Sequence, residues 1–200
     1  MTQVYYRDQA LEAIARRVVK THDAALLSSP RAIPIEEIIG TCGLEIDYQY
    51  IRNNGRILGE TIFDDTLIPV YDKDNGQYSF ISVRRGSIII DASLLQPAKI
   101  GRLRFTMAHE LAHWLIHQEI YTGTGESAAM LNKPLKSSEA DAGLERQADR
   151  LACFLLMPTG QVKTAFYHNR NHADLTAAIA NLFGVSRQAM DIRLKELRLV

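Results

Sequence analysis

"RFTMAHELAHWLIH", residues 104–117, is the stretch of this sequence that decides the fold. Two histidines, His109 and His113, stand four positions apart, and Glu110 directly follows the first. Residues four apart share one face of an α-helix, so both imidazoles can reach one point. Zinc accepts imidazole nitrogen, and two histidines at this spacing form a natural pair of ligands. Glu110 is rotated by about 100° from His109. We therefore expect its carboxylate to act on a metal-bound water as general base.

The alternative is a packed helix whose histidines form a polar stripe without a metal. The flanking residues argue against it, because they leave almost no position for a solvent-facing side. They are Phe105, Met107, Ala108, Leu111, Ala112, Trp114, Leu115 and Ile116. A helix that is apolar nearly all round is buried. Buried histidine and glutamate need partners, and a metal ion supplies them.

A third metal ligand has to come from another segment, which leaves the fourth position for water. His117 is not expected to be that ligand, since its Cα lies about 12 Å along the helix axis from that of His109. We interpret it as a residue at the helix end or behind the ligands. The helix expected in "LERQADRLACFLLMP", residues 144–158, is the better source, with Glu145 and Asp149 on one stripe.

Glu145 is therefore predicted to complete the zinc site. Asp149 is predicted to accept the free N–H of a ligand histidine and so to fix its tautomer. The alternative is that both carboxylates form ion pairs with the neighbouring Arg146 and Arg150.

The order of the expected elements indicates an α+β fold. Apolar spacing predicts a helix over residues 8–22, and Pro34 and Gly40 bracket a second one. Short β-branched and aromatic segments follow, separated by turn sequences, and predict an antiparallel meander. These segments are residues 44–50, 56–63, 67–72, 78–83 and 87–91.

We expect one domain over residues 1–200. Its parts are N-terminal helices within 8–40, a sheet within 44–91, metal-site helices with an intervening loop within 101–158, and a C-terminal helix pair within 172–198. Residues 121–141 are small, polar and aperiodic, which predicts a loop that acts as a lid. Residues 86–91, or a neighbouring strand, are the candidate sheet edge for a bound peptide. The alternative is that this strand is central in the sheet and that the loop is only a spacer.

Charge and hydropathy exclude several classes of protein. The chain has 23 basic and 23 acidic residues, which argues against a broad nucleic-acid or membrane surface. Its N-terminus is too polar for a signal peptide, and no apolar run approaches a membrane span. Cys42 and Cys153 are far apart in sequence and do not suggest a disulfide framework. We expect a cytoplasmic protein without a membrane partner.

The two metal-site segments together resemble the ImmA/IrrE-type zincin-like metallopeptidases. The resemblance rests on "RFTMAHELAHWLIH" followed by E-x-x-A-D-x-x-A-x-x-L-L-M-P, with "SIIID" before and "FGVSRQAMDIRLKEL" after them. It implies a gluzincin-type fold in which a small antiparallel-rich sheet packs on the active-site helix with flanking helices. It also implies that His109, His113 and Glu145 bind zinc and that Glu110 is the catalytic base. Family members often have Asn where this chain has Asp149. The aspartate adds a negative charge beside the metal.

The resemblance further implies a regulatory function. Members are typically cytoplasmic bacterial or mobile-element proteins that cleave a helix-turn-helix transcriptional repressor or relieve its repression, and the repressor is often encoded nearby. The expected activity is thus that of a zinc-dependent endopeptidase that hydrolyses a peptide bond in such a protein partner.

Two other functions remain open. Residues 175–197 have the outline of a DNA-binding helix-turn-helix, with Gly184 at the turn and Ser186 as N-cap. Direct DNA binding is not expected, because one helix pair on a neutral chain offers few phosphate contacts. The other alternative is a metal-bound scaffold that sequesters its partner uncut, but a scaffold has no need of Glu110. No pattern assigns a residue that stabilises the transition state; the candidates are Tyr121, Tyr167, His168 and His172.

Overall fold

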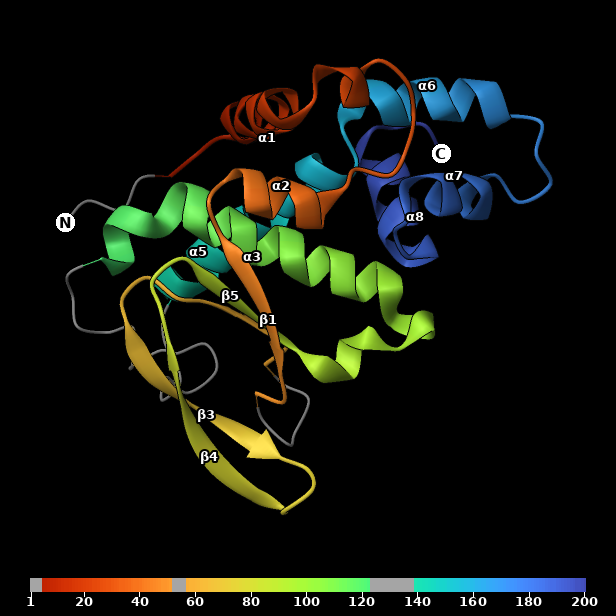
Figure 1. Ribbon diagram of the computed structural model, residues 1–200. Coiled ribbons are helices and arrows are strands. Elements are labelled where there is room, and N and C mark those ends of the chain that lie inside the picture. The colour runs from red at the N-terminus through yellow and green to blue at the C-terminus, as the bar shows by residue number, and fades with distance from the viewer. Residues whose placement is uncertain (1–4, 52–56, 123–138) are drawn as a thin grey trace.

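A long helix, α3 (Ile100–Tyr121), runs through the middle of the fold, with a small sheet on one side and helices on the other (Figure 1). The computed structural model describes residues 5–51, 57–122 and 139–200. Leu103, Met107, Ala108 and Leu111 of α3 are buried, as its apolar sequence predicts. The architecture is mixed α+β, with strands gathered between N-terminal and C-terminal helices.

The sheet under α3 has three strands in the order β1-β5-β2. β1 (Glu45–Gln49) runs parallel to β5 (Ser87–Asp91), and β2 (Gly59–Thr61) runs antiparallel to it. The predicted antiparallel meander is wrong in this respect, because the sheet is mixed. Residues 86–91 themselves are not the sheet edge, which agrees with the alternative of a central strand, and the edge lies at a neighbouring strand. β5 is the central strand, and its neighbour β2 is an edge strand.

The two faces of β5 belong to two different parts of the core. Ile88 and Ile90 face the main core with α3, whereas Ile89 faces the opposite side. There it packs with a separate hairpin of β3 (Thr66–Asp72) and β4 (Gln77–Val83). A strand with both faces covered is expected in the interior of a sheet.

The outer face of this hairpin is apolar and exposed. Leu67 is 59% and Phe80 is 70% exposed. The backbone N–H of Tyr71 donates to the Tyr50 carbonyl and not to β4. The backbone N–H and C=O groups of every second residue of β3, counted from Tyr71, therefore also point away from β4. Pro69, which has no N–H, is one of them and is paired with Phe80. The backbone groups of Phe80 therefore point away from β3, and β4 contains neither a charge nor a proline.

Three helices cover the other side of α3. They are α1 (Asp8–His22), α2 (Ile35–Thr41) and α5 (Glu139–Leu156). α1 lies over α5 and buries Leu11, Ala15 and Val19, and its bounds match the predicted range of 8–22. Short 3-10 turns connect the helices and strands at Ala24–Leu27, Ala92–Leu95 and Pro97–Lys99.

The C-terminal helices form a unit against the start of α3. They are α6 (Thr159–Asn169), which the sequence did not predict, α7 (Leu175–Phe183) and α8 (Arg187–Glu196). The predicted turn between the last two is present, with Gly184 at φ 63° and the Ser186 side chain accepting from the Ala189 N–H. Arg104 of α3 donates from Nε to the Gly184 carbonyl at 3.0 Å. A Cβ on Gly101 would lie 2.8 Å from the Ser186 nitrogen, so the turn lies directly on α3.

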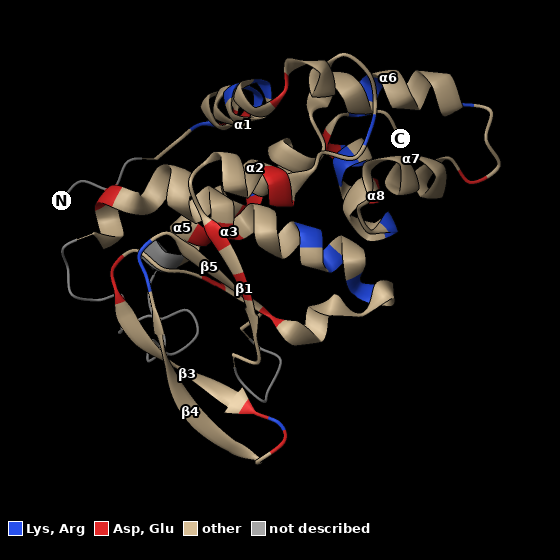
Figure 2. Cartoon of the chain, in the orientation of Figure 1, with Lys and Arg blue, Asp and Glu red and all other residues tan. Residues whose placement is uncertain are grey.

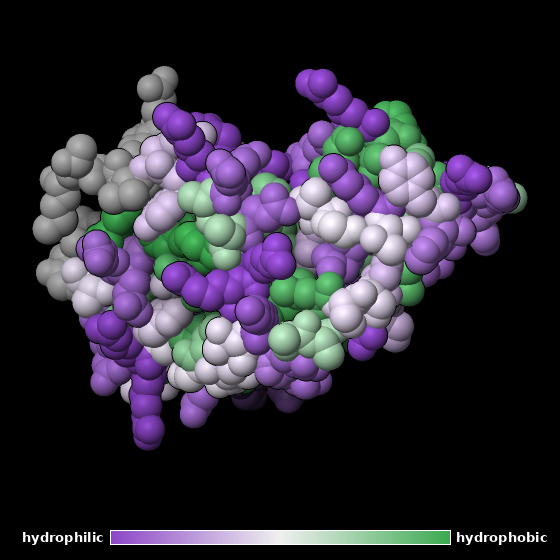
Figure 3. Space-filling view, turned by 90° about the horizontal axis from the view of Figure 1, so that it is seen from above, coloured by the Kyte–Doolittle hydropathy of each residue, from purple (hydrophilic) through white to green (hydrophobic). Residues whose placement is uncertain are grey.

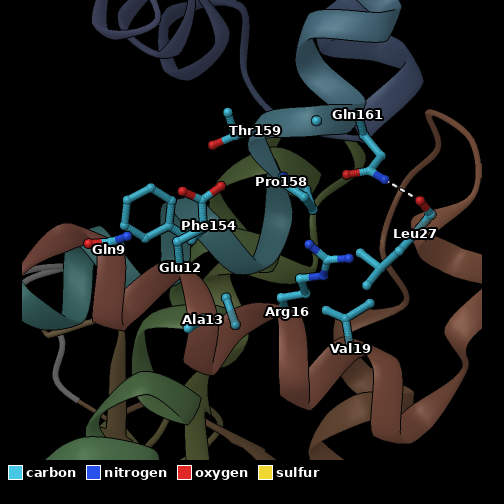
Figure 4. Close-up of a pocket in the computed structure, with 12 residues that line it drawn as sticks. Gln9, Glu12, Ala13, Arg16, Val19, Leu27, Phe154, Pro158, Thr159 and Gln161 are labelled. Carbon is cyan, nitrogen blue, oxygen red and sulfur yellow. Dashed lines mark hydrogen bonds between the residues drawn. The ribbon is translucent and has the colours of Figure 1, made fainter.

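The surface over α1 and α6 is mostly hydrophilic, with apolar side chains in separate areas (Figure 3). A cavity of about 450 Å³ lies between α1 and the start of α6, lined by Glu12, Arg16, Phe154 and Thr159 among others (Figure 4). The Gln161 amide closes one side of it by donating to the Leu27 carbonyl. None of the residues that line this cavity belongs to the predicted metal site.

Among the helices that the structure describes, none combines the length and the apolar character needed to cross a membrane.

Candidate metal centre

The predicted ligands meet where α3 and α5 pack against each other. His109 and His113 come from the middle of α3, and Glu145 comes from the first half of α5. One ligand atom from each of these three residues lies within 4.8 Å of the other two, so the three residues could hold a metal ion. The two helices are in extensive contact, which fixes the carboxylate opposite the imidazoles.

The spacing of the donor atoms fits a tetrahedral zinc ion. His109 Nε2 lies 3.0 Å from His113 Nε2 and 3.3 Å from Glu145 Oε2. His113 Nε2 lies 3.5 Å from Glu145 Oε1. Zinc bonds of about 2.0–2.1 Å at tetrahedral angles separate ligand atoms by about 3.3 Å. Two imidazoles and one carboxylate with these separations can hold zinc and leave a fourth position for water.

His109 is held from behind by Asp149. Its Nδ1 lies 2.9 Å from Asp149 Oδ1, one turn after Glu145 on α5. Burial opposes a charge on the ring, but the hydrogen bonds to Asp149 and Glu145 outweigh it and raise the pKa of His109 to about 10 in the metal-free protein. An aspartate in this position directs Nε2 of the ring toward the ligand group.

Arg150, one of the two arginines in the alternative interpretation, does not pair with these carboxylates. Arg150 donates to Asp8 and to Glu196, with nitrogen–oxygen distances of 2.6 Å to each. It therefore links α5 to α1 and α8 and leaves Glu145 and Asp149 to the histidines.

His113 and His117 are deeper in the protein than His109. His117 is completely buried, and its Nδ1 lies 3.0 Å from His113 Nδ1. Burial lowers the pKa of His113 well below its usual value and lowers the pKa of His117 to about 4, so both rings are neutral at pH 7. His117 is not a member of the ligand group but contacts one of its members.

The side chain of Glu110 contacts strand β2. The Thr61 hydroxyl donates to Glu110 Oε2 at 2.8 Å and to the backbone oxygen of Glu110 at 2.9 Å. A Cβ on Gly59 would lie 2.7 Å from Glu110 Oε1, so this position has room for glycine alone. Burial raises the pKa of Glu110, while His109 and Thr61 oppose that rise. A desolvated carboxylate with a raised pKa is suited to accept and return a proton.

Comparison with known families decides the classification. The Peptidase_M78 model, described as the IrrE N-terminal-like domain, matches residues 66–195. This chain belongs to the Peptidase_M78 family. The resemblance to ImmA/IrrE-type proteins is thereby confirmed. Comparison with curated proteins gave no match.

A solved structure supports the same fold for this Peptidase_M78 member. It is a Mycobacterium tuberculosis transcriptional regulator with a TM-score of 0.51 and 16% sequence identity. The similarity covers 93% of this chain but 46% of the other, so this chain spans about half the length of that protein.

Other expectations concern residues around the site. Much of the predicted lid, residues 121–141, lies outside the described residues, which resume at residue 139. Tyr121 packs on Phe63 with ring centroids 5.0 Å apart and lies 6.4 Å from the His113 ring. Tyr167 is 60% exposed on α6. The geometry selects none of the candidate residues for transition-state stabilisation.

Two residues of β2 that contact Glu110 were not predicted from the sequence. Thr61 and Gly59 lie about fifty positions before Glu110, in a strand of three residues. No local pattern connects them to the metal-binding helices, because their role follows from the antiparallel pairing of β2 with β5. The sequence indicates only that Gly59 and Thr61, two positions apart in a strand, lie on the same face of the sheet.

The basic residues of α8 are engaged within this Peptidase_M78 chain. Arg193 is 2% exposed and donates to Thr159 Oγ1 at 2.8 Å. Lys195 pairs with Asp191 at 2.7 Å. Basic and acidic residues both occur along the helices (Figure 2). Together with the contact between the α7–α8 turn and α3, this arrangement gives the helix pair a packing role.

Proposed function

We propose that this chain is a zinc-dependent endopeptidase of regulatory type. Its substrate is a protein partner, a helix-turn-helix transcriptional repressor, in which it hydrolyses a peptide bond. The fold is of the zincin-like, gluzincin type. The observation that carries the proposal is the group of His109, His113 and Glu145 with donor atoms at tetrahedral spacing, next to the buried carboxylate of Glu110. Membership of a peptidase family and a fold shared with a protein named as a transcriptional regulator support it.

The three ligand residues would hold zinc through His109 Nε2, His113 Nε2 and the Glu145 carboxylate. When bound, zinc polarises the scissile carbonyl and lowers the pKa of water toward about 7. Glu110 takes a proton from the attacking water and returns it to the leaving amine. Because Thr61 donates to Oε2, Oε1 is the atom of Glu110 left to carry that proton.

The edge strand β2 offers a binding position for the substrate backbone. The Ile62 N–H donates to the Ser87 carbonyl, and the Asp91 N–H donates to the Leu58 carbonyl. The even-numbered residues of this segment therefore direct their backbone hydrogen-bonding groups toward β5. Gly59 and Thr61 therefore direct their backbone groups away from the sheet. A peptide added as a strand at this edge lies next to Glu110 and is gripped with little dependence on its sequence.

The test combines metal analysis with cleavage. The purified protein is incubated with zinc and the proteins encoded beside its gene, and fragments are identified by mass spectrometry. We expect about one zinc per chain and cleavage of the repressor. Glu110→Gln should keep zinc and lose at least about 10²-fold in cleavage rate, the scale of general-base catalysis. Glu119→Gln, an exposed glutamate on the same helix, is the control and should cleave like the parent.

Each failure has a distinct meaning. A parent protein that binds no zinc contradicts the metal site. A Glu110→Gln variant that cleaves at the parental rate contradicts the role of the base. A zinc-loaded parent that binds the repressor and leaves it intact supports the scaffold in place of the peptidase.

A further inference from the structure

His117 is a buried histidine that the proposed reaction does not use. It follows His113 by one turn of α3, with ring centroids 5.0 Å apart. The two Nδ1 atoms face each other at 3.0 Å, which is hydrogen-bonding distance. In a hydrogen bond between these two nitrogens, one carries the proton and the other accepts it.

The position of His113 decides which ring is the donor. Its Nε2 is the atom that faces His109 and Glu145, at 3.0 and 3.5 Å. A neutral imidazole that binds a metal through Nε2 carries its proton on Nδ1. The His113 Nδ1–H therefore donates to His117 Nδ1, and the proton of His117 lies on its own Nε2.

We propose that His117 is a positioning residue for the metal site. Its Nδ1 accepts from His113 and holds that ring in the tautomer and orientation in which Nε2 is free to bind zinc. The inference rests on the proposed function, because it assumes that His113 is a zinc ligand.

The other nitrogen of His117 supports this assignment. Nε2 is buried and has no hydrogen-bond partner within the part of the chain that the structure describes. A buried donor without a partner weakens a fold, so such groups are rare in native proteins. A leucine would fill the same place without that cost. The contact that His117 makes through Nδ1 is the one that a leucine could not replace.

The two ligand histidines thus have different partners behind them. His109 is backed by the carboxylate of Asp149, which is 56% exposed. His113 is deeper, and a carboxylate behind it would be a further buried negative charge. Glu110, Glu145 and Asp149 already contribute three negative charges around a site for a doubly charged ion. A neutral imidazole supplies the acceptor without adding a fourth.

The experiment compares two substitutions of similar size. In His117→Asn, the amide oxygen stands near the place of Nδ1 and can accept from His113. In His117→Leu, a methyl group stands there and no acceptor remains. Zinc affinity is measured by competition with a chromophoric chelator. We expect His117→Leu to lose about 10–100-fold in affinity, the usual effect of removing the partner of a ligand histidine. His117→Asn should remain within a few-fold of the parent.

A second measurement does not depend on how well a variant folds. Long-range proton–nitrogen spectra of the zinc-loaded parent report which ring nitrogen carries a proton. We expect the proton on Nδ1 of His113 and on Nε2 of His117. The opposite tautomer of His117, or equal zinc affinity in the Leu and Asn variants, overturns the proposal. A parent that binds no zinc contradicts the proposed function itself, which keeps the two failures apart.

Discussion

Replacing Gly59 with alanine tests the close contact between β2 and the proposed base. The added Cβ would lie 2.7 Å from Glu110 Oε1, 2.7 Å from Thr106 Cγ2 and 2.8 Å from Glu110 Cγ. Favourable contacts between carbon atoms are about 3.5–4.0 Å, so the overlap is about 1 Å. Helix α3 is enclosed by the core, and β2 is a three-residue edge strand. We therefore expect β2 to move outward and the carboxylate of Glu110 to rotate.

The magnitude follows from two general scales. Overpacking of this kind costs about 1–3 kcal/mol of unfolding free energy. In a chain of this size each kcal/mol shifts the melting temperature by about 2–4 °C. Gly59→Ala should thus melt about 2–12 °C below the parent in a thermal scan followed by circular dichroism. A displacement of about 1 Å in a catalytic group costs about 10²-fold in rate. Zinc content should stay unchanged, because none of the three atoms nearest to that Cβ belongs to a ligand residue.

Gly40→Ala is the matched control for this substitution. Gly40 lies in α2, is exposed, and a Cβ there would meet no atom within 4 Å. Alanine is favoured over glycine in a helix by about 0.5–1 kcal/mol, so this variant should melt about 1–4 °C higher than the parent. If Gly59→Ala instead melts and cleaves like the parent, β2 does not press on Glu110 and the reasoning is refuted.

The remaining predictions concern the metal and the C-terminal helices. Zinc at 100 times its dissociation constant should stabilise the parent by about 2.7 kcal/mol in thermal unfolding. Glu145→Ala should lose most of this gain, and an equal gain in both proteins contradicts Glu145 as a ligand. The metal-free protein should lose stability as pH rises from about 6.5 through about 10, because the folded-state pKa of His109 is raised above its unfolded value of about 6.5. Zinc binding at pH 8 should then release about one proton, measured by calorimetry in buffers of different ionisation enthalpy, and fewer protons in Asp149→Asn; equal release would contradict this account. Arg193→Leu should cost about 1–3 kcal/mol in denaturant unfolding, because the Thr159 hydroxyl and the Met157 carbonyl lose a buried donor; a variant as stable as the parent would show that these contacts contribute nothing.

The helices and the ligand helix pair were largely predictable from the sequence. Helical periodicity gave α1 and the stripe that carries Glu145 and Asp149, since residues four apart share a face. The turn at Gly184 and the cap at Ser186 follow from local chemistry alone. These features depend on residues close together in the chain.

The arrangement of the strands was not predictable by the same means. Alternation identifies a strand but not its partner, and β1 pairs with β5 across an intervening hairpin. A signal was nevertheless present in Ile88, Ile89 and Ile90, because three consecutive apolar residues indicate a strand buried on both faces. Thr61 and Gly59 could not be connected to Glu110 without this pairing. The contacts that position the base therefore depend on strand topology, which the local pattern does not contain.

The outer edge of the β3–β4 hairpin has a consequence for the protein in concentrated solution. Natural edge strands commonly carry a lysine, a proline or a bulge that keeps other chains from pairing with them. Pro69 serves this purpose on β3, but the sequence QYSFISV of β4 has no such protection, and Phe80 is exposed on it. We expect the colloidal stability of the protein to depend on these seven residues more than on its balanced charge. The segment that limits its handling at high concentration is thus separate from the segments that form the metal centre.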